Sequence, residues 1–574
     1  MTVMRRARGG VGFLLVTLGL AACSTPAAPP PMTLGSAPPP PPPPDRAGSR
    51  IVLPASPLTS DQQILHVLNR LGYGPRPGDL ERVKRIGLAR YIERQLDPAS
   101  IDDARVEQAL AAYPVLTMPA AELVRGYPRP TPPEIPKGGA DEMRPKAITE
   151  AFPAERRPYR TTEAMQAAKL TRAIGSERQL QEVMVDFWFN HFNVYAQKGA
   201  VQWMVPAYEG EAIRPHALGR FRNLLMATAR HPAMLFYLDN WVSTHADFIA
   251  LAGPYKGTRR GLNENYGREL MELHTLGVDG GYTQADVTEV ARCFTGWSID
   301  RPDQGGGFIF RPRAHDRGAK RVLGQIIPAG GDVTDGVRVI DILSRHPSTA
   351  RFVSTKLVRR FVSDDPPALL VDRAAVTFRD TDGDIRAVLE TIFTSPEFFS
   401  AGAYRAKVKT PLEVVASAAR VLGAEISPPG TGAQPWVGGA LVLARQVGKL
   451  GEPLYQARPP TGYPDQAEAW VNSGALLGRM NFALALAQAR LPGVRVDLHR
   501  TLSGVDQSQP SQVLDRLLIA LLHGEASPAT RAILTRELDS PEITRLTRDD
   551  RAPKSTDVEK LAALVLGSPE FQRR

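Results

Sequence analysis

The sequence has 574 residues, of which 43% are hydrophobic and 23% are charged, a balance that is ordinary for a globular protein. This length allows a large core in two or more lobes. The formal net charge is +10, but basic and acidic residues are mixed along the chain, so no nucleic-acid-binding stripe is indicated and no nucleic-acid partner is expected.

The first residues have the pattern of an export signal. Three arginines, at positions 5, 6 and 8, precede an apolar run over residues 11–20 that is too short to span a bilayer. The run ends in Leu20-Ala21-Ala22-Cys23, which resembles the lipobox of bacterial lipoproteins. This resemblance implies removal of residues 1–22 as a signal peptide and acylation of Cys23 with chains such as palmitate. The alternative is a plain secretory signal with an incidental cysteine.

The segment that follows has the composition of a tether. Residues 24–49 are rich in Pro, Ala, Gly and Ser, and they bury too little apolar surface to fold. Polyproline II at ~3.1 Å per residue lets about 25 residues reach roughly 80 Å from a membrane. We expect the acylated cysteine and tether to occupy residues 23–57 and the folded part to occupy residues 58–574. Cys293, the second cysteine, is expected to be a buried thiol.

Apolar periodicity predicts a mainly α-helical fold, one large multi-helix domain. The helix over 59–70 has Thr59 or Ser60 as its N-cap and Gly72 beyond its end. The other expected helices cover residues 77–86, 88–96, 161–194, 215–230, 231–239, 336–345, 348–363, 384–394, 410–423, 437–449, 468–491, 510–523, 527–537 and 556–566.

Three segments interrupt this helical pattern. Residues 113–160 are rich in proline and charge, which predicts a long surface excursion. Residues 308–327 form two short apolar runs around a polar turn, which predicts the one small β-hairpin, with His315 and Asp316 at its turn. The loop of residues 459–465, followed by Trp470, is a rigid aromatic segment of the kind that lines a pocket.

Residues 178–194 are apolar almost all round, as in a buried helix. At ~100° per residue, Asp186, Asn190 and Asn193 nevertheless fall within roughly 60° of one another. An unpaired buried amide or carboxylate costs about 1–3 kcal/mol or more, so this polar stripe must find partners on another element.

The stretch 261–297 carries the densest set of groups that bind or transfer protons. It reads as two helices, and Thr283 with Asp286 forms the capping box of the second. On the first helix, Asn265, Glu269 and Glu272 share a face of roughly 60°. Arg268 can meet Glu272 four residues on. His274 lies about 140° from Glu269, so the spacing is not that of a zinc protease.

These two polar faces are natural complements, and we expect them to meet in a buried polar seam of Asn190, Asn193 and Asn265 with the carboxylates. In that cluster Glu269 or Glu272 would be a base or a metal ligand, Arg268 an anion or transition-state stabiliser, and Asp186 a further catalytic carboxylate. The candidate ligands of a divalent metal are His191, His274, His315 and Asp316. The alternative is a structural network of buried polar groups.

Several long motifs resemble those of a known family. They are LNRLGYGPRPGDLERV, DFWFNHFNV, HPAMLFYLDN, the stretch 261–297, AHDRGAKRVLG, HPSTARFVSTKLVRRFVSDDPP and PPTGYPD. Together they resemble the bacterial exported family catalogued as domain of unknown function 1800, over residues 58–574. The resemblance implies an exported, mostly helical protein without an agreed activity. It also implies a partner among exported sulfatase- and phosphatase-like proteins of the family called domain of unknown function 1501.

Two hypotheses about function follow. The first is a metal-dependent or acid–base enzyme, hydrolytic in type, that uses the Asp/Asn/Glu/His cluster; no GxSxG, P-loop, GxGxxG or CxxC motif indicates another common class. The second is a non-catalytic envelope scaffold that binds a partner protein. Under both, we expect a lipid on Cys23 to anchor the protein, which faces the periplasm or the cell surface. In the pattern of bacterial lipoproteins that the lipobox resembles, Ser24 rather than Asp after the cysteine favours the outer membrane.

Overall fold

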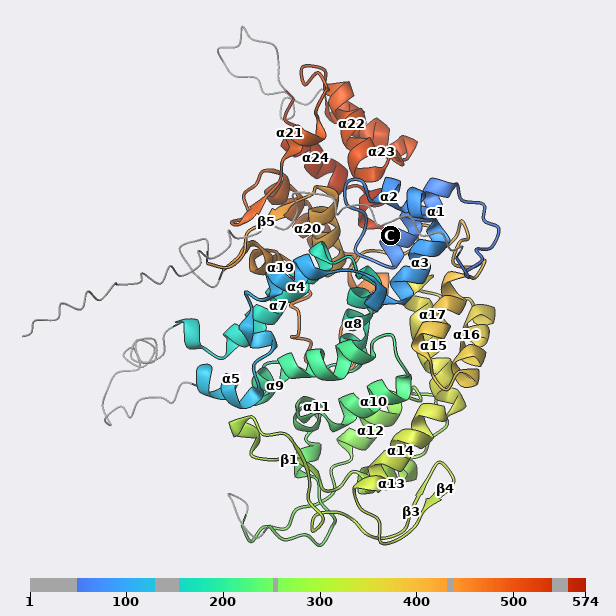
Figure 1. Cartoon of the computed structure of the whole chain (residues 1–574), viewed down its shortest axis with the longest axis vertical. Helices are drawn as coiled ribbons and strands as arrows, with labels where there is room; N and C mark the ends of the chain where they lie inside the picture. Colours follow the sequence, from blue (N-terminus) through green and yellow to red (C-terminus); the bar gives the residue numbers. More distant parts are fainter. Residues whose placement is uncertain (1–48, 130–153, 251–255, 431–436, 539–555) are drawn as a thin grey trace, which may run out of the picture.

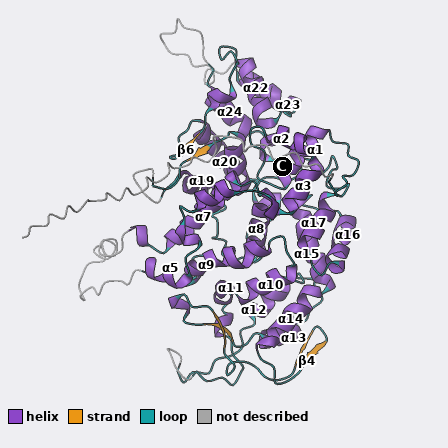
Figure 2. Ribbon diagram, in the orientation of Figure 1, coloured by secondary structure: helices purple, strands orange, loops and turns teal. Residues whose placement is uncertain are grey.

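Helices make up most of the computed structural model, which describes residues 49–129, 154–250, 256–430, 437–538 and 556–574 (Figure 2). The mainly α-helical class is therefore confirmed. In Figure 1 the helices α22 to α24 lie at one end of the long axis, and α12 to α14 with the strands β1, β3 and β4 lie at the other. Helix α8 lies between these ends.

The helices have the following bounds: α1 Ser60–Arg70, α2 Asp79–Ile86, α3 Leu88–Leu96, α4 Ala104–Leu110, α5 Ala120–Gly126, α7 Tyr159–Gly175, α8 Gln179–His191, α9 Val201–Ala207, α10 Phe221–Arg230, α11 Pro232–Tyr237, α12 Asn265–Glu272, α13 Gln284–Cys293, α14 Val333–Arg345, α15 Pro347–Phe361, α16 Ala368–Asp380, α17 Ile385–Phe393, α18 Pro411–Val421, α19 Gly439–Lys449, α20 Ser473–Ala487, α21 Leu498–Thr501, α22 Pro510–Leu522, α23 Pro528–Glu537, α24 Val558–Leu566 and α25 Pro569–Gln572. Most of the predicted helices agree with these bounds to within a few residues.

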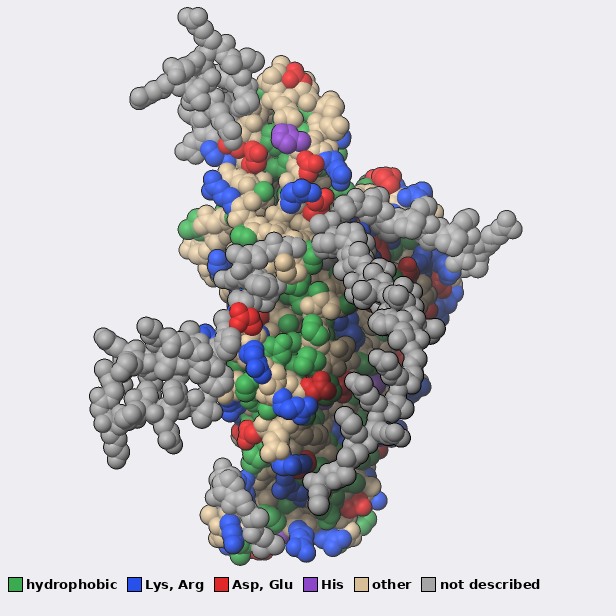
Figure 3. All heavy atoms as spheres, turned by 60° about the vertical axis from the view of Figure 1, so that its left-hand side comes forward, with side chains coloured by type: hydrophobic (Ala, Val, Ile, Leu, Met, Phe, Trp, Pro, Cys, Tyr) green, Lys and Arg blue, Asp and Glu red, His purple; other side chains and the backbone are tan. Residues whose placement is uncertain are grey.

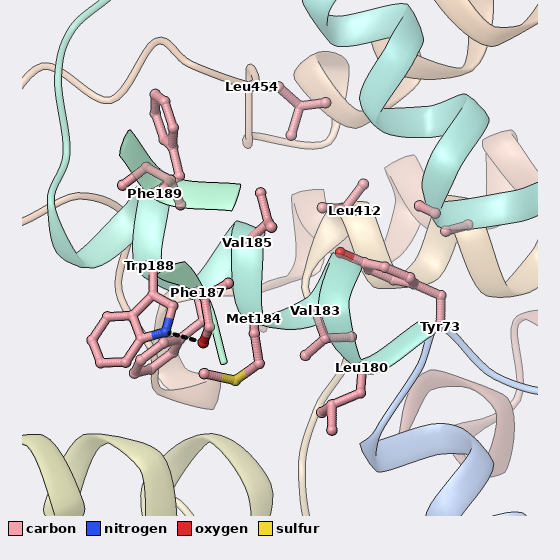
Figure 4. Packing of buried hydrophobic residues seen from close by; sticks show 14 of the residues in the cluster. Tyr73, Leu180, Val183, Met184, Val185, Phe187, Trp188, Phe189, Leu412 and Leu454 are labelled. Carbon is pink, nitrogen blue, oxygen red and sulfur yellow. Dashed lines mark hydrogen bonds between the residues drawn. The ribbon is translucent and has the colours of Figure 1, made fainter. Parts of the chain in front are cut away.

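Helix α8 is surrounded by other elements, as its apolar sequence predicts. Val183, Met184 and Trp188 are fully buried, and Figure 4 shows them packed with Leu180 and the phenol ring of Tyr73 nearby. The indole Nε1 of Trp188 donates to the carbonyl of Ala217 at 2.9 Å, which satisfies its polar atom. Full burial of such a side chain contributes about 1.5–3 kcal/mol, so α8 is a major source of the stability of the fold.

The predicted helix caps are present. Thr59 caps α1 and Thr283 caps α13, each with a reciprocal capping box in which the third helical residue bonds back to the cap. Thr410 caps α18 in the same way, with Glu413 as its partner and Pro411 at the first helical position. This arrangement satisfies two N–H groups that the helix itself leaves unpaired. It also fixes the direction in which residues 407–410 approach α18.

The six short strands among the described residues form three antiparallel pairs. Strand β1 (Trp297–Ile299) pairs with β2 (Phe308–Phe310), β3 (Lys320–Val322) with β4 (Gln325–Ile327), and β5 (Glu425–Ile426) with β6 (Val494–Arg495). The segment 308–327 is therefore not one hairpin, because its first apolar run pairs back to β1. The turn of the β3–β4 hairpin is Leu323-Gly324, and both residues have positive φ, the geometry that matches the twist of paired strands.

Some segments differ from the sequence-based expectation. Helix α16, which was not expected, buries Leu370, Val371 and Phe378 on one face. The predicted excursion contains helix α5, and its residues 130–153 lie outside the described residues. Cys293 is a buried free thiol, as predicted, and burial raises its pKa to about 12.

The predicted signal peptide, Cys23 and most of the tether lie in residues 1–48, outside the described residues. Within the part of the chain that is described, no helix is long and apolar enough to cross a membrane. On the face shown in Figure 3, basic and acidic side chains are interspersed.

Candidate active site

A narrow cleft runs along the polar side of α8, and we call it the central cleft. It encloses about 70 Å³, and its other walls are the end of α15, residues 407–413, and the loop of residues 452–470. Its charged lining residues are Lys169, Asp186, Arg360, Lys407, Glu413, Glu452, Asp465 and Arg574. Aromatic rings of Tyr455, Tyr463 and Trp470 complete the lining, so the predicted pocket-lining role of the loop 459–465 with Trp470 is confirmed.

A wider groove of about 380 Å³ lies elsewhere, between β4 and α14. Two of its charged residues are bound to surface partners: Arg345 reaches Asp382, and Arg222 on α10 reaches Asp341. Because both of these pairs are solvent-exposed or half-exposed, they contribute little energy. The central cleft, although smaller, holds the buried titratable groups.

All three residues of the predicted polar stripe line the central cleft: Asp186 and Asn190 lie on α8, and Asn193 lies two residues beyond the end of that helix. Nδ2 of Asn190 donates to the carbonyl of Tyr463 at 2.8 Å, and the N–H of Tyr463 donates to Oδ1 of Asn190 at 2.7 Å. Nδ2 of Asn193 donates to the carbonyls of Ala457 (3.0 Å) and Pro459 (2.8 Å). The two asparagines are therefore bonded to loop backbone groups, and Asp186 is bonded to Lys169 on α7. The seam hypothesis, which expected the polar face of α12 as the partner, is wrong.

The polar groups of α12 have their own partners. Arg268 donates to Gln284 at 2.7 Å and lies 3.8 Å from Glu264, so it does not pair with Glu272. Glu272 accepts from the hydroxyl of Tyr282 at 3.0 Å.

The first residue of α12 is also engaged locally. The N–H of Asn265 donates to Oδ1 of Asn263 at 2.9 Å. Burial raises the pKa of Glu269, and the charge of Glu272 raises it further. Neither Arg268, Glu269 nor Glu272 lines the central cleft.

His191 and His274 lie side by side behind the cleft. Their ring centroids are 6.2 Å apart, and Nε2 of His191 donates to the carbonyl of His274 at 3.1 Å. Burial lowers the pKa of both imidazoles, that of His274 to about 3, so both are neutral at pH 7. Among the described residues, Nδ1 of His191 and Nε2 of His274 have no hydrogen-bond partner.

His315 and Asp316 lie far from this pair, on the segment between β2 and β3. His315 is buried, with Nδ1 2.8 Å from the carbonyl of Thr295 and Nε2 3.2 Å from Asp335. Asp316 accepts two hydrogen bonds from Arg292, at 2.8 and 3.1 Å. In the described ranges, no three His, Cys, Asp or Glu side chains are grouped as metal ligands. A divalent metal thus stays a prediction.

The central cleft contains one carboxyl group that sequence reasoning missed. Glu452 is 7% exposed, and its Oε2 accepts from the N–H of Leu412 in the first turn of α18, at 2.8 Å. Burial raises the pKa of Glu452 to about 8, and the charge of Asp186 adds to this effect. Glu452 therefore carries a proton at neutral pH.

Asp186 is the second carboxyl group of this site and has a different environment. Its side chain is 29% exposed, and it accepts from Nζ of Lys169 at 2.8 Å. The same ammonium lies 4.8 Å from the ring centroid of Tyr455 and 3.8 Å from Glu209. One cleft thus presents a protonated carboxyl and a paired carboxylate.

Cations dominate the opposite wall. The carboxylate of Glu413 accepts a hydrogen bond from Nη1 of Arg360 at 2.5 Å, and its other oxygen lies 3.0 Å from Nε of Arg574. Lys407 is paired with Asp364 and also donates to the carbonyl of Asp465 at 3.2 Å. These residues come from α15, α18 and four segments outside helices, so no local sequence pattern links them. The one local signal was the capping-box motif Thr410-Pro411-Leu412-Glu413.

The fold and this cleft define a mainly α-helical protein with a narrow, charged candidate site. The family model described as "Protein of unknown function (DUF1800)" matches residues 66–573, and the chain belongs to this family. The predicted resemblance is therefore confirmed. No curated protein and no solved structure matches the sequence.

Proposed function

We propose that the chain is a hydrolase that uses acid–base chemistry in the central cleft. Glu452 is the general acid, and Asp186 is the general base. The observation that carries this proposal is the difference between the environments of the two carboxyl groups: burial raises the pKa of Glu452 to about 8, whereas Asp186 is 29% exposed and paired with Lys169. Two carboxyl groups whose environments separate their protonation states form the usual acid–base pair of hydrolytic sites.

In this mechanism Asp186 takes a proton from water as the water attacks, and Glu452 donates its proton to the leaving group. The hydrogen bond from Leu412 to Oε2 fixes the orientation of the Glu452 carboxyl group. Lys169 holds Asp186 towards the cleft and offsets its charge in the resting site. Proton transfer of this kind contributes typically about 10²- to 10⁴-fold in rate.

The test uses chromogenic aryl esters, phosphoesters and glycosides with the wild type, Glu452→Gln and Asp186→Asn. The wild type should hydrolyse one of these classes, with a rate that falls above pH 8 as Glu452 loses its proton. Each variant should lose about 100-fold or more. Glu468→Gln, an exposed carboxyl change on the same loop, is the matched control and should keep full activity. The proposal is wrong if the wild type cleaves none of these substrates or if Glu452→Gln is fully active.

A scaffold is the second candidate function. Two features support it: Glu413 is sealed by two arginines, and an apolar patch of Val471, Leu476 and Leu477 is exposed where α20 begins. A folded protein with no hydrolytic activity that forms a stable complex with a partner, such as an exported member of the domain of unknown function 1501 family, would favour this candidate. If Leu477→Asp abolishes that complex, the exposed apolar patch is the surface that binds the partner.

The envelope location and the metal site are further proposals. The motif Leu20-Ala21-Ala22-Cys23 supports a lipoprotein of the outer membrane, and intact mass measurement of the wild type against Cys23→Ser tests it. Acyl mass that persists in Cys23→Ser contradicts acylation at this residue.

The metal site is tested by elemental analysis of the untagged protein and of a Glu269→Gln, Glu272→Gln double variant. A metal-free wild type rules it out.

A further inference from the structure

The inner wall of the central cleft contains a cluster of buried cations. Arg70, Arg360, Lys407 and Arg574 gather around the carboxylates of Asp364 and Glu413, while a third carboxylate, that of Asp465, pairs with Lys356 at 3.5 Å. Arg70 is fully buried one layer behind the lining, and Arg574 and Lys407 are 4% and 3% exposed. A buried cation is strongly unfavourable unless it is paired and hydrogen-bonded, so any N–H group without a partner on this wall is a candidate contact for an anion.

The hydrogen-bonding capacity of the same cations is only partly used. Among the described residues, Nη1 of Arg574 and both Nε and Nη1 of Arg70 have no hydrogen-bond partner. Nη2 of Arg574 donates only to the carbonyl of Arg360, at 3.3 Å. Arg574 lines the cleft, and its unpartnered Nη1 is buried rather than open to solvent. A guanidinium with free N–H groups is suited to bind an oxyanion.

The cations also oppose one another. Arg360 and Arg70 both act to lower the pKa of Lys407, and burial, the largest cause, acts in the same direction. Asp364 is the carboxylate that opposes these effects at Lys407. On the other side of the cleft, Glu452 is protonated and adds no negative charge at pH 7. A bound oxyanion would relieve the repulsion among the cations.

We infer that the wall formed by Lys407 and Arg574, backed by Arg70, is an oxyanion subsite, so the molecule that enters the central cleft carries a phosphate, sulfate or carboxylate group. The volume of about 70 Å³ admits one such group or several waters. As a statement about the substrate, this inference rests on the proposed function, whereas binding of the anion itself does not. Hydrolysis would then act on a bond close to the anionic group.

The experiment titrates the full chain with inorganic phosphate, sulfate and acetate in a calorimeter, with chloride used to hold the ionic strength constant. The wild type should bind phosphate or sulfate saturably, and acetate shows whether a carboxylate is sufficient. Arg574→Gln should weaken binding about tenfold or more, the loss expected for a charge-assisted contact. Arg573→Gln removes the same charge from the exposed neighbouring residue and should leave the affinity within about twofold.

Crystals soaked in selenate locate the anion in the wild type, so the inference remains testable even if Arg574→Gln fails to fold. Selenate between Arg574 and Lys407 supports it. A wild type with no saturable binding, an Arg574→Gln variant with unchanged affinity, or selenate bound elsewhere overturns it. Glu452→Gln separates the two proposals, because it should lose hydrolysis while still binding phosphate. An active Glu452→Gln would show that Glu452 is not the general acid, and it would not affect the inference of an oxyanion subsite.

Discussion

Asn190 and Tyr463 exchange two hydrogen bonds, at 2.8 and 2.7 Å, between an amide side chain of α8 and the backbone of a loop 273 residues away. The side chain thus replaces a backbone partner and fixes the loop as a wall of the central cleft. This relationship leads to the first two predictions.

Asn190→Ala should destabilise the protein and loosen the loop. It leaves the N–H and the carbonyl of Tyr463 without partners, which costs about 1–3 kcal/mol. Urea unfolding should show the lower stability, and amide hydrogen exchange should be faster in residues 457–463. Asn481→Ala, an exposed change on α20, is the control and should leave both measurements unchanged. Equal exchange rates in the wild type and Asn190→Ala would show that the two hydrogen bonds between Asn190 and Tyr463 do not hold the loop.

Gly462→Ala should destabilise the protein more than the addition of one methyl group would suggest. Gly462 has φ +71°, and a Cβ atom there would lie 2.4 Å from both the carbonyl oxygen and Oδ1 of Asn190. Gly504 is the matched control, because it also has a positive φ (+80°) but has no atom within 4 Å of such a Cβ. Gly504→Ala should cost only the backbone strain, about 1–2 kcal/mol.

Gly462→Ala should cost clearly more than this control, because the clash pushes the loop away from α8. Thermal unfolding of both variants measures the difference. If the two variants have the same melting temperature, Gly462 is not held against Asn190 as described.

The stability of the protein should fall as the pH rises through the range set by Glu452. Its pKa in the folded state is about 8, above the 4.5 of a free carboxyl group. Between these values the folded protein binds more protons than the unfolded chain, so the free energy of unfolding falls with pH, by up to about 1.4 kcal/mol per pH unit.

Glu452→Gln should remove this dependence, because glutamine is neutral and can still accept from Leu412. Urea unfolding at pH 5, 6, 7 and 8 measures the slope. The exposed Glu468→Gln should keep the slope of the wild type. A slope that survives in Glu452→Gln would show that another group is responsible.

Acid should destabilise the protein through His274. Burial lowers the pKa of its imidazole to about 3, below the ordinary 6.5, so the unfolded chain takes up a proton that the folded state does not bind. The free energy of unfolding should therefore fall as the pH drops below 6.5, by up to about 1.4 kcal/mol per pH unit. His274→Leu should reduce this loss between pH 6.5 and pH 4, as measured by thermal unfolding. His499→Leu, at an exposed position, should not.

The sequence predicted most helices because their apolar spacing and caps are local signals. The capping boxes at Thr59 and Thr283 are examples. Helix α16 had the same kind of signal, with Leu370, Ala374 and Phe378 spaced by four residues, and was overlooked. The pairing of β1 with β2 was harder to predict, because strands of three residues carry almost no periodicity.

Two features of the candidate site were predictable from local sequence patterns. The helical period grouped Asp186, Asn190 and Asn193, which all line the cleft although α8 ends at His191. Proline and aromatic residues marked the loop that they face. Glu452, Lys407 and Arg360 could not be found in this way. Their chemistry comes from burial and from neighbours hundreds of residues away, and periodicity within one helix carries no information about either.

The walls of the central cleft come from α7 and α8, from the end of α15, from residues 407–413 and from the loop 452–470. Contacts between such distant segments form only after long chain loops have closed, which is entropically slow. Individual helices can form earlier, but none of them contains the site. Recovery of anion binding or hydrolysis after dilution from denaturant should therefore lag behind recovery of helical circular dichroism, which makes the cleft a reporter of the last stage of refolding.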